Sequence, residues 1–326
     1  MRHPRLKPKG KVNVFHCLSR TAGGHRLFGD PEREQFRKLM WQQAAFCQVQ
    51  IVTHTMLGSH FHIVVRTPAK VNLSDTKLLA ALRDFYGPDS PQVKAFKTAL
   101  KKKKEDPDRL ETLRQQYHKR MGDVSMFMKE LKQAFSRWFN KRHDRFGTLW
   151  AERFTSVLVQ DQSKALWVVA GYVDLNALRA GRVRDPKDYR FCGYAEAVAG
   201  HKRAREGLLT LMPPGRSWKA FQREYRMFLF LEAAKPGHSS KMQLKPEEIE
   251  KVLKAGGKLH LAQLLRVRVR YLRAGVILGS REFVEATWKK HCRKWSPKRQ
   301  SGARKMKGGD WQGVMTLRDL QKDVIG

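Results

Sequence analysis

The stretch LGSHFHIVVR, residues 57–66, limits what this chain can fold into more than any other part of it. Side chains of a β-strand point alternately to its two faces, so residues two apart project together. The stretch therefore predicts a strand with His60 and His62 on one face, and with Phe61 and Ile63 on the other. Two adjacent imidazoles either bind a metal ion or result from packing alone, and the rest of the chain has to decide between these readings.

The elements around this strand follow the order of the split βαβ fold. Apolar patterns predict strands at 11–19, 49–57, 57–66 and 154–160, and helices at 30–46, 127–142 and 161–178. Asp30 is expected to cap the first helix and Asp161 the last. We therefore predict an α+β fold, a ferredoxin-like palm with an antiparallel sheet and flanking helices.

Two further segments add to this palm. The segment from about residue 68 to 123 is polar, lysine-rich and helical in character, which predicts an inserted helical segment with a basic face. A basic, mostly helical extension that binds DNA is expected over 197–326, with a linker at about 233–248. The palm itself would then occupy residues 1–196.

The charge balance points to the class of partner. Lysine and arginine number 66 against 30 aspartates and glutamates, a formal net charge of +36. Such a charge predicts a polyanionic partner, usually nucleic acid, although a ribosome-associated protein without catalytic chemistry would show it too. The four cysteines form no CxxC pair, which fits a reducing compartment. Neither a signal peptide nor an apolar run of ~20 residues is present, so we expect a cytoplasmic protein with no membrane partner.

A His-x-His pair alone is a weak signal, and other metal sites have to be weighed. A metallo-hydrolase of the His-x-His-x-Asp-His type needs an acid and a histidine soon afterwards, and HIVVRTP supplies neither. A two-histidine phosphoesterase needs a second motif, and the candidate at His238–Ser240 lies in the expected linker. His54 has a strand parity that could bring it to the cluster, although a buried structural histidine is the favoured interpretation.

Tyr172 and Asn176 sharpen the hypothesis. Residues four apart on a helix lie on one face, about one turn from each other. An amide oxygen can complete a ligand set with two imidazoles, and a tyrosine one turn away would place its phenolic oxygen near the same metal. An in-line attack on a phosphodiester needs this combination of nucleophile and cation. Tyr172 could equally be an aromatic residue that packs between helix and sheet.

Three segments together resemble the single-tyrosine HUH transposases, and most closely the REP-associated tyrosine transposases. They are GSHFHIVV (58–65), FNKRHDRFGTLWAERFTSVLV (139–159) and GYVDLNALRAGRVRDPKDYRFCGY (171–194), in that order and spacing. PRLKPKGKVNVFHCLSR at 4–20 is similar to the opening of that domain. The resemblance covers roughly residues 4–196, which would make this part the catalytic domain.

The resemblance implies roles for four residues. His60 and His62 would be the metal-binding pair, Tyr172 the nucleophile and Asn176 the third metal ligand, with Mg²⁺ or Mn²⁺ as the metal. The partner would be single-stranded or hairpin DNA, such as palindromic repeats, in a prokaryotic, nucleoid-associated protein. Gly58-Ser59 replaces the common Pro-Asn and Ala177 replaces a proline, and neither change removes a reacting group. A monomer is favoured over a homodimer.

The DNA-binding surface is expected in the stretch 137–154, where basic and aromatic residues interleave. Basic side chains bind phosphates, and aromatic rings stack on exposed bases. Arg142, Arg145, Trp150 and Arg153 are the candidates. The basic stretch 289–307 would either clamp DNA or remain a solvated anchor.

Three functions are compatible with these observations. The first is a DNA strand transferase and endonuclease that acts through a 5′-phosphotyrosine link. The second is a DNA-binding protein derived from such a transposase that no longer cleaves. The third is an RNA-binding or ribosome-linked basic protein, which leaves His60, His62, Tyr172 and Asn176 unexplained.

Overall fold

The structure is a computed structural model that describes residues 5–230, 259–292, 299–320 and 324–325. The linker expected at about 233–248 lies outside the described residues. Where the chain is described, no helix is both long enough and apolar enough to cross a bilayer.

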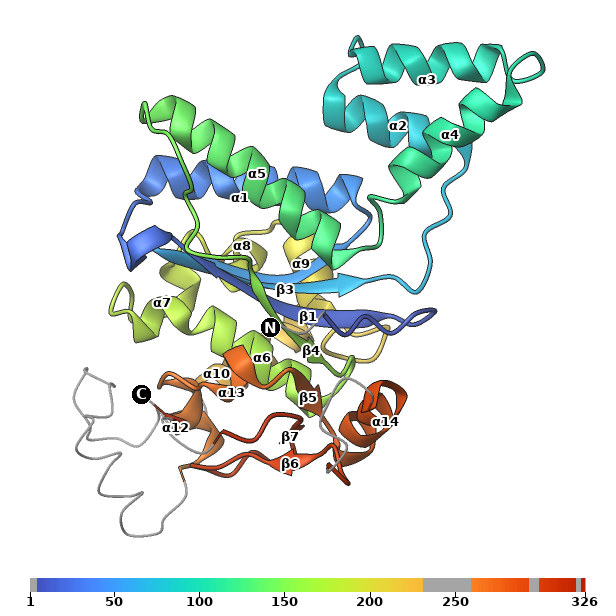
Figure 1. Ribbon diagram of the computed structural model, residues 1–326. Helices are drawn as coiled ribbons and strands as arrows, with labels where there is room; N and C mark the ends of the chain where they lie inside the picture. The colour runs from blue at the N-terminus through green and yellow to red at the C-terminus, as the bar shows by residue number, and fades with distance from the viewer. Residues whose placement is uncertain (1–4, 231–258, 293–298, 321–323, 326) are drawn as a thin grey trace.

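The palm has the predicted α+β fold. Its strands are β1 (Asn13–Arg20), β2 (Gln50–Met56), β3 (His60–Thr67) and β4 (Thr155–Val159). They pair in the order β2-β3-β1-β4, and every pair is antiparallel. The helices of the palm are α1 (Asp30–Phe46), α5 (Val124–Arg142) and α6 (Lys164–Asp174). Figure 1 shows α1 and α5 on one face of the sheet and α6 on the other.

The two faces of β3 differ as its alternation predicts. Phe61 packs against Phe36 of α1, with ring centroids 4.7 Å apart. His62 points to the opposite face, where α6 lies, and is buried there. The apolar face therefore closes the core under α1 and α5, and the histidines face α6.

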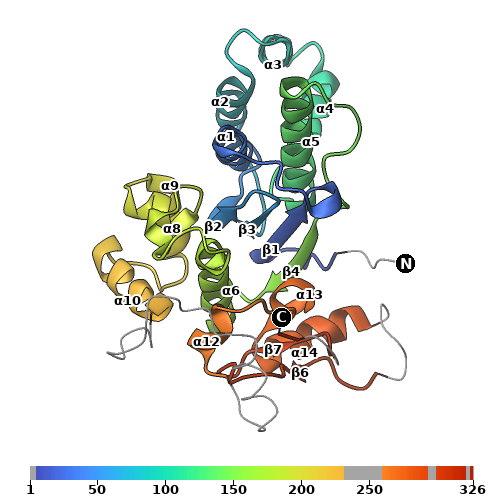
Figure 2. The same ribbon diagram turned by 90° about the vertical axis from the view of Figure 1, so that its left-hand side faces the viewer.

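The segment between β3 and α5 forms three helices that project from the palm, at the top of Figure 2. They are α2 (Asp75–Tyr86), α3 (Pro91–Lys101) and α4 (Pro107–His118). Ser74, Ser90 and Asp106 cap them, because each side chain accepts a hydrogen bond from a backbone N–H in the first turn. This agrees with the helical insertion expected at about 68–123.

Some helix ends differ from the sequence prediction. Gly29 is the N-cap of α1, with the Glu32 carboxylate accepting from the Gly29 N–H at 2.8 Å, so Asp30 is the first helical residue. Ser163, not Asp161, caps α6, because Asp161 is engaged by Arg66 at 2.9 Å. The long helix expected over 161–178 ends at Asp174 and resumes as α7 (Asn176–Arg179).

The C-terminal part continues the sheet of the palm, which the sequence did not predict. The parallel pairing of β5 (Ile277–Gly279) with β4 gives a seven-stranded sheet in the order β2-β3-β1-β4-β5-β7-β6. Figure 1 shows β5, β6 and β7 below the strands of the palm. The remaining elements are η1 (Ala22–Gly24), η2 (Pro186–Asp188), α8 (Gly193–Val198), α9 (Lys202–Leu209), α10 (Trp218–Phe230), α12 (Leu261–Leu265), α13 (Tyr271–Ala274), α14 (Arg281–His291), β6 (Arg304–Lys305) and β7 (Met315–Thr316).

The stretch expected to be a basic tail is partly built into this core. Ala303 and Met306 of the stretch 289–307 are buried in the same apolar cluster as the palm residues, as are Trp311 and Leu317 after it. The described part of 289–307 is therefore not simply a solvated tail.

Candidate active site

The structure brings four sequence-selected residues together on the α6 side of the sheet. Asn176 Nδ2 lies 3.5 Å from His60 Nε2. The ring of Tyr172 stands edge-on to the ring of His62, with centroids 6.0 Å apart. His60 and His62 are themselves edge to face at 5.4 Å. Strand pairing and helix packing thus converge on one small cluster of two imidazoles, one amide and one phenol.

A third histidine, His16 of β1, supports this cluster. His16 Nδ1 lies 2.7 Å from the Leu272 carbonyl oxygen, which can only accept, so Nδ1 carries the proton. His16 Nε2 is then the acceptor for His62 Nδ1, which lies 2.8 Å away. His62 Nδ1 must donate, and its Nε2 keeps a lone pair. This arrangement fixes the tautomer of His62 and leaves its Nε2 able to bind a ligand.

The environment keeps these imidazoles neutral. Burial lowers the pKa of His16 to about 4. Burial, followed by the positive charges of Arg20 and nearby arginines, lowers the pKa of His60 to about 3. Burial and the neighbouring histidines hold the pKa of His62 well below its usual value. At neutral pH all three rings are therefore uncharged, which is the state in which imidazole binds a metal.

The Arg179 side chain bridges the two sides of the helix break at Leu175. The Tyr172 carbonyl oxygen accepts from Arg179 Nη2 at 2.6 Å, and the same nitrogen lies 3.2 Å from Asn176 Oδ1. The guanidinium carbon sits 3.8 Å from the centroid of the Tyr172 ring. Burial lowers the pKa of Arg179 to about 10, which leaves it charged at neutral pH. One cation thus holds both the tyrosine and the asparagine in place.

The donor set fits a divalent metal only in part. His60 Nε2, His62 Nε2 and the Asn176 amide are neutral groups that can act as ligands, and the nitrogen donors suit Mn²⁺ better than Mg²⁺. In the described part of the chain, no three His, Cys, Asp or Glu side chains form a metal-binding group. Phosphate oxygens of a bound nucleic acid would have to supply the negative charge.

His54 does not join this cluster, so its expected strand parity was wrong. Partners across the β2–β3 hairpin place His54 opposite Ile63 and Thr55 opposite His62. His54 therefore faces α1, where its ring stands edge-on to Trp41 at 5.9 Å. The favoured interpretation, a buried structural histidine, agrees with this position.

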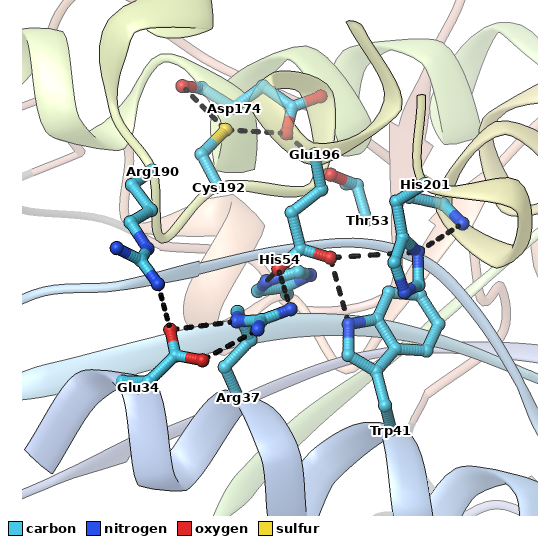
Figure 3. A network of polar contacts seen from close by, with 11 residues as sticks. Glu34, Arg37, Trp41, Thr53, His54, Asp174, Arg190, Cys192, Glu196 and His201 are labelled. Atoms are coloured by element: carbon cyan, nitrogen blue, oxygen red, sulfur yellow. Dashed lines mark hydrogen bonds and ion pairs between the residues drawn. The ribbon is translucent and has the colours of Figure 1, made fainter. Parts of the chain in front are cut away.

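The neighbours of His54 form a separate polar network, shown in Figure 3. Glu196 Oε1 lies 3.4 Å from His54 Nε2 and 3.5 Å from Arg37 Nη1, and Glu196 Oε2 accepts from Trp41 Nε1 at 2.8 Å. Burial opposes the ionisation of Glu196, but His54, Arg37 and Trp41 outweigh it and lower the pKa of Glu196. The buried carboxylate is thus matched by positive charge and donors.

Asp174 anchors α6 in the same region. Its carboxylate accepts from Thr53 Oγ1 at 2.5 Å and from Tyr225 Oη at 2.6 Å, and Cys192 Sγ lies 3.3 Å from Asp174 Oδ1. Burial raises the pKa of Asp174. These contacts fix the end of the helix that carries Tyr172.

The residues chosen for DNA contact are placed differently from one another. Arg142, Arg145 and Arg153 are exposed. Trp150 is buried against Phe28 and neighbouring rings, so it does not present its face to solvent. The structure thus leaves these three arginines accessible to DNA, while Trp150 belongs to the core.

Comparisons with known proteins add a distant structural likeness. A scan against protein-family models and a search of curated proteins found no match. Among solved structures, the chain is similar to a protein structure described as "Structure of the REP associates tyrosine transposase bound to a REP hairpin". The TM-score is 0.40 and the identity 14%, over 61% of this chain and 86% of that one. The geometry of the site has to carry the functional argument.

Sequence reasoning missed His16, Arg179 and the contribution of residues 266–274, the segment from which the Leu272 carbonyl oxygen contacts His16 Nδ1. His16 could have been found from strand alternation. It lies on a predicted strand and points to the same face as Arg20, which pairs with His60. Arg179 lies one turn beyond the tyrosine and asparagine. The contribution of 266–274 had no sequence signal, because it depends on the pairing of β5 with β4.

Proposed function

We propose that this protein is a metal-dependent transposase of the HUH type, a single-stranded DNA endonuclease and strand transferase that forms a 5′-phosphotyrosine link through Tyr172. Its substrate is single-stranded or hairpin DNA, such as palindromic repeats. The observation that supports the proposal is the packing of the Tyr172 phenol against the neutral imidazoles of His62 and His16 and against the buried Arg179. A purely structural tyrosine needs none of these neighbours.

The chemistry follows from the groups present. The phenolic oxygen of Tyr172 forms a bond to phosphorus while the P–O3′ bond breaks, and its electron pair leaves with O3′. The phenolic proton passes to solvent, and O3′ takes up a proton from water. The positive charge of Arg179 lies against the Tyr172 ring, where it would stabilise negative charge that develops during the attack.

The remaining residues of the site position the reactants. His60, His62 and Asn176 would hold Mg²⁺ or Mn²⁺, which when bound neutralises charge on the phosphate oxygens. His16 keeps the His62 ring oriented, because it accepts from His62 Nδ1. Arg179 holds the Asn176 side chain, and so also sets the distance between amide and phenol.

One observation favours the second function, a DNA-binding protein that does not cleave. The Tyr172 side chain is only 2% exposed, so a scissile phosphate reaches its hydroxyl only if the site opens. A protein in which the site stays closed would bind DNA and release it unchanged.

A covalent-adduct experiment separates the two. The protein is incubated with Mn²⁺ and a pool of end-labelled, hairpin-forming single strands with flanking single-stranded segments. Cleavage through tyrosine gives a labelled protein that survives denaturing electrophoresis, and digestion places the nucleotide on the peptide that contains Tyr172. Retarded DNA without any adduct, over the whole pool, supports the non-cleaving protein instead.

A further inference from the structure

A cavity of about 410 Å³ opens beside the candidate active site, between the palm and the C-terminal part. Its palm side is formed by the end of β1 and the segment before β4. Its other side is formed by residues 268–274. The arginines that line it are Arg20, Arg153, Arg268, Arg270 and Arg273, and Glu152 is the acidic residue in the lining.

The charge in this cavity is not balanced as it is around Glu196. The Nε atoms of Arg20 and Arg273 are buried and have no hydrogen-bond partner among the described residues. Burial and the charges of Arg273 and Arg268 lower the pKa of Arg20, which is the expected effect of cations placed close together. Arg20 and Arg273 are half-buried and the other three arginines are exposed, so an anion bound between them would relieve the repulsion.

The cavity adjoins the histidine pair. Arg20 pairs with His60 across β1 and β3. Arg20, Arg273 and Arg268 all act electrostatically on His60. The residue before Arg273, Leu272, supplies the carbonyl that orients His16. The same C-terminal segment thus contributes to the cavity and to the support of the histidines.

The basic surface continues past the cavity. A second cavity of about 830 Å³ shares residues 151–153 with it and is lined also by Arg5, Lys129 and Arg137. A small anion would fill one arginine cluster, whereas two basic cavities that share a wall suit a chain of phosphates. The partner indicated is a flexible single strand, because it can follow such a path.

We propose that residues 268–273 of the C-terminal part, together with Arg20, bind two adjacent backbone phosphates of single-stranded DNA beside the phosphate that would be cleaved. The proposal rests on the proposed function for its choice of DNA. Binding at this cavity is nevertheless separable from cleavage, because it needs neither Tyr172 nor a metal.

The test is the salt dependence of binding in EDTA, where metal-dependent cleavage cannot occur. Wild type and the Arg268→Gln/Arg273→Gln variant are titrated with an oligodeoxythymidine of roughly 20 nucleotides. Each neutralised phosphate contributes about 0.7 to the log–log slope for single strands, so the double variant should lose about 1.4. An Arg268→Lys/Arg273→Lys variant keeps the charges and should restore most of the slope.

The matched control removes two arginines elsewhere. Arg216 and Arg223 are exposed and line neither cavity, so Arg216→Gln/Arg223→Gln should leave the slope unchanged. Equal slopes for both glutamine variants would overturn the proposal. Should the first variant fold poorly by circular dichroism, Arg268→Gln alone, at an exposed position, should lose about half as much, and no loss counts against the proposal.

Hydrogen exchange locates the contact. Backbone amides of 266–274 should be protected when the oligodeoxythymidine is added to wild type, and not in the glutamine variant. An unprotected segment in wild type contradicts the proposal, and tighter binding of oligouridine would reassign the cavity to RNA. A smaller salt-dependence slope in the glutamine variant, together with no covalent adduct in wild type, would support this binding site and contradict cleavage. A covalent adduct in wild type, together with an unchanged slope in the glutamine variant, would support cleavage and contradict this binding site.

Discussion

Two buried histidine clusters lie on neighbouring strands of one sheet and differ in their charge. Around His54 on β2, Glu196 is matched by Arg37 and Trp41. Around His62 on β3, the neighbours are neutral rings and arginines such as Arg179. In the first cluster the carboxylate lies within ion-pair distance of His54 and Arg37, so its charge is matched, although among the described residues neither ring nitrogen of His54 makes a hydrogen bond. Among the described residues, the charged groups that act on the second cluster are arginines, and His62 Nε2 keeps a lone pair that is available to a ligand.

The difference teaches how to tell a structural histidine from a reactive one. Burial alone does not separate them, because His54 and His62 are both about 2% exposed. What separates them is whether the protein itself supplies a negative charge that balances the positive charge around the histidine. Removal of the carboxylate from a balanced network lowers the stability of the folded protein. A network that carries only positive charge lowers that stability until an anion binds. The following substitutions test this distinction.

The largest effect is expected at Tyr172, the proposed nucleophile. Tyr172→Phe removes one oxygen from a buried ring, so the fold and the binding of hairpin DNA should persist. Cleavage and the covalent adduct should both disappear. Both are measured by denaturing electrophoresis of labelled strands, with binding measured separately in EDTA. Cleavage by the phenylalanine variant at the wild-type rate would make water the nucleophile and the protein a nuclease rather than a strand transferase.

A matched pair of substitutions tests the two histidine clusters directly. His62→Gln removes a candidate metal ligand and should abolish metal-dependent cleavage while DNA binding in EDTA remains. His54→Gln changes the same side chain on the neighbouring strand and should leave cleavage per folded molecule unchanged, with a lower melting temperature. Equal losses of cleavage in both variants would mean that the distinction between the clusters is wrong.

A smaller effect is expected at His16. His16→Phe keeps a ring of similar size but leaves His62 Nδ1 without its acceptor. Loss of such a supporting partner typically costs about 10–100-fold in metal affinity. Titration with Mn²⁺ followed by electron paramagnetic resonance, in the presence of bound single-stranded DNA, measures this. An unchanged affinity would show that the tautomer of His62 is not set by His16.

The local part of the site could be predicted from the sequence, and the remainder could not. Strand alternation placed His60 and His62 on one face, and helical spacing placed Tyr172 near Asn176, because both depend on neighbours along the chain. The parity of His54 was misjudged, since it depends on which residues pair across the hairpin. The arginines of 268–273 depend on the pairing of β5 with β4, a contact between distant segments that no local pattern encodes.

This placement also changes the experiment for the basic stretch 289–307. Its expected role as a clamp or an anchor suggests deletion of everything from residue 289 onward. That deletion would remove β7, which pairs with β5, and the buried residues Trp311 and Leu317. Loss of DNA binding would then report unfolding, so point substitutions at arginines are the usable test.

The smallest effect on cleavage is expected at Glu196, where the effect on stability is the informative one. Glu196→Gln leaves His54 and Arg37 without their buried carboxylate, and should cost about 2 kcal/mol at neutral pH. Because the folded protein lowers the pKa of Glu196, its contribution to stability is present above the usual pKa of 4.5 and is lost as the pH falls through the lower, folded value. The free energy of unfolding of wild type should therefore fall more steeply below about pH 4.5 than that of the variant. Urea unfolding over this pH range measures both slopes, with cleavage at neutral pH as the control. Parallel slopes would show that Glu196 is not the charge that closes the His54 cluster, and reduced cleavage at full folding would connect the two clusters after all.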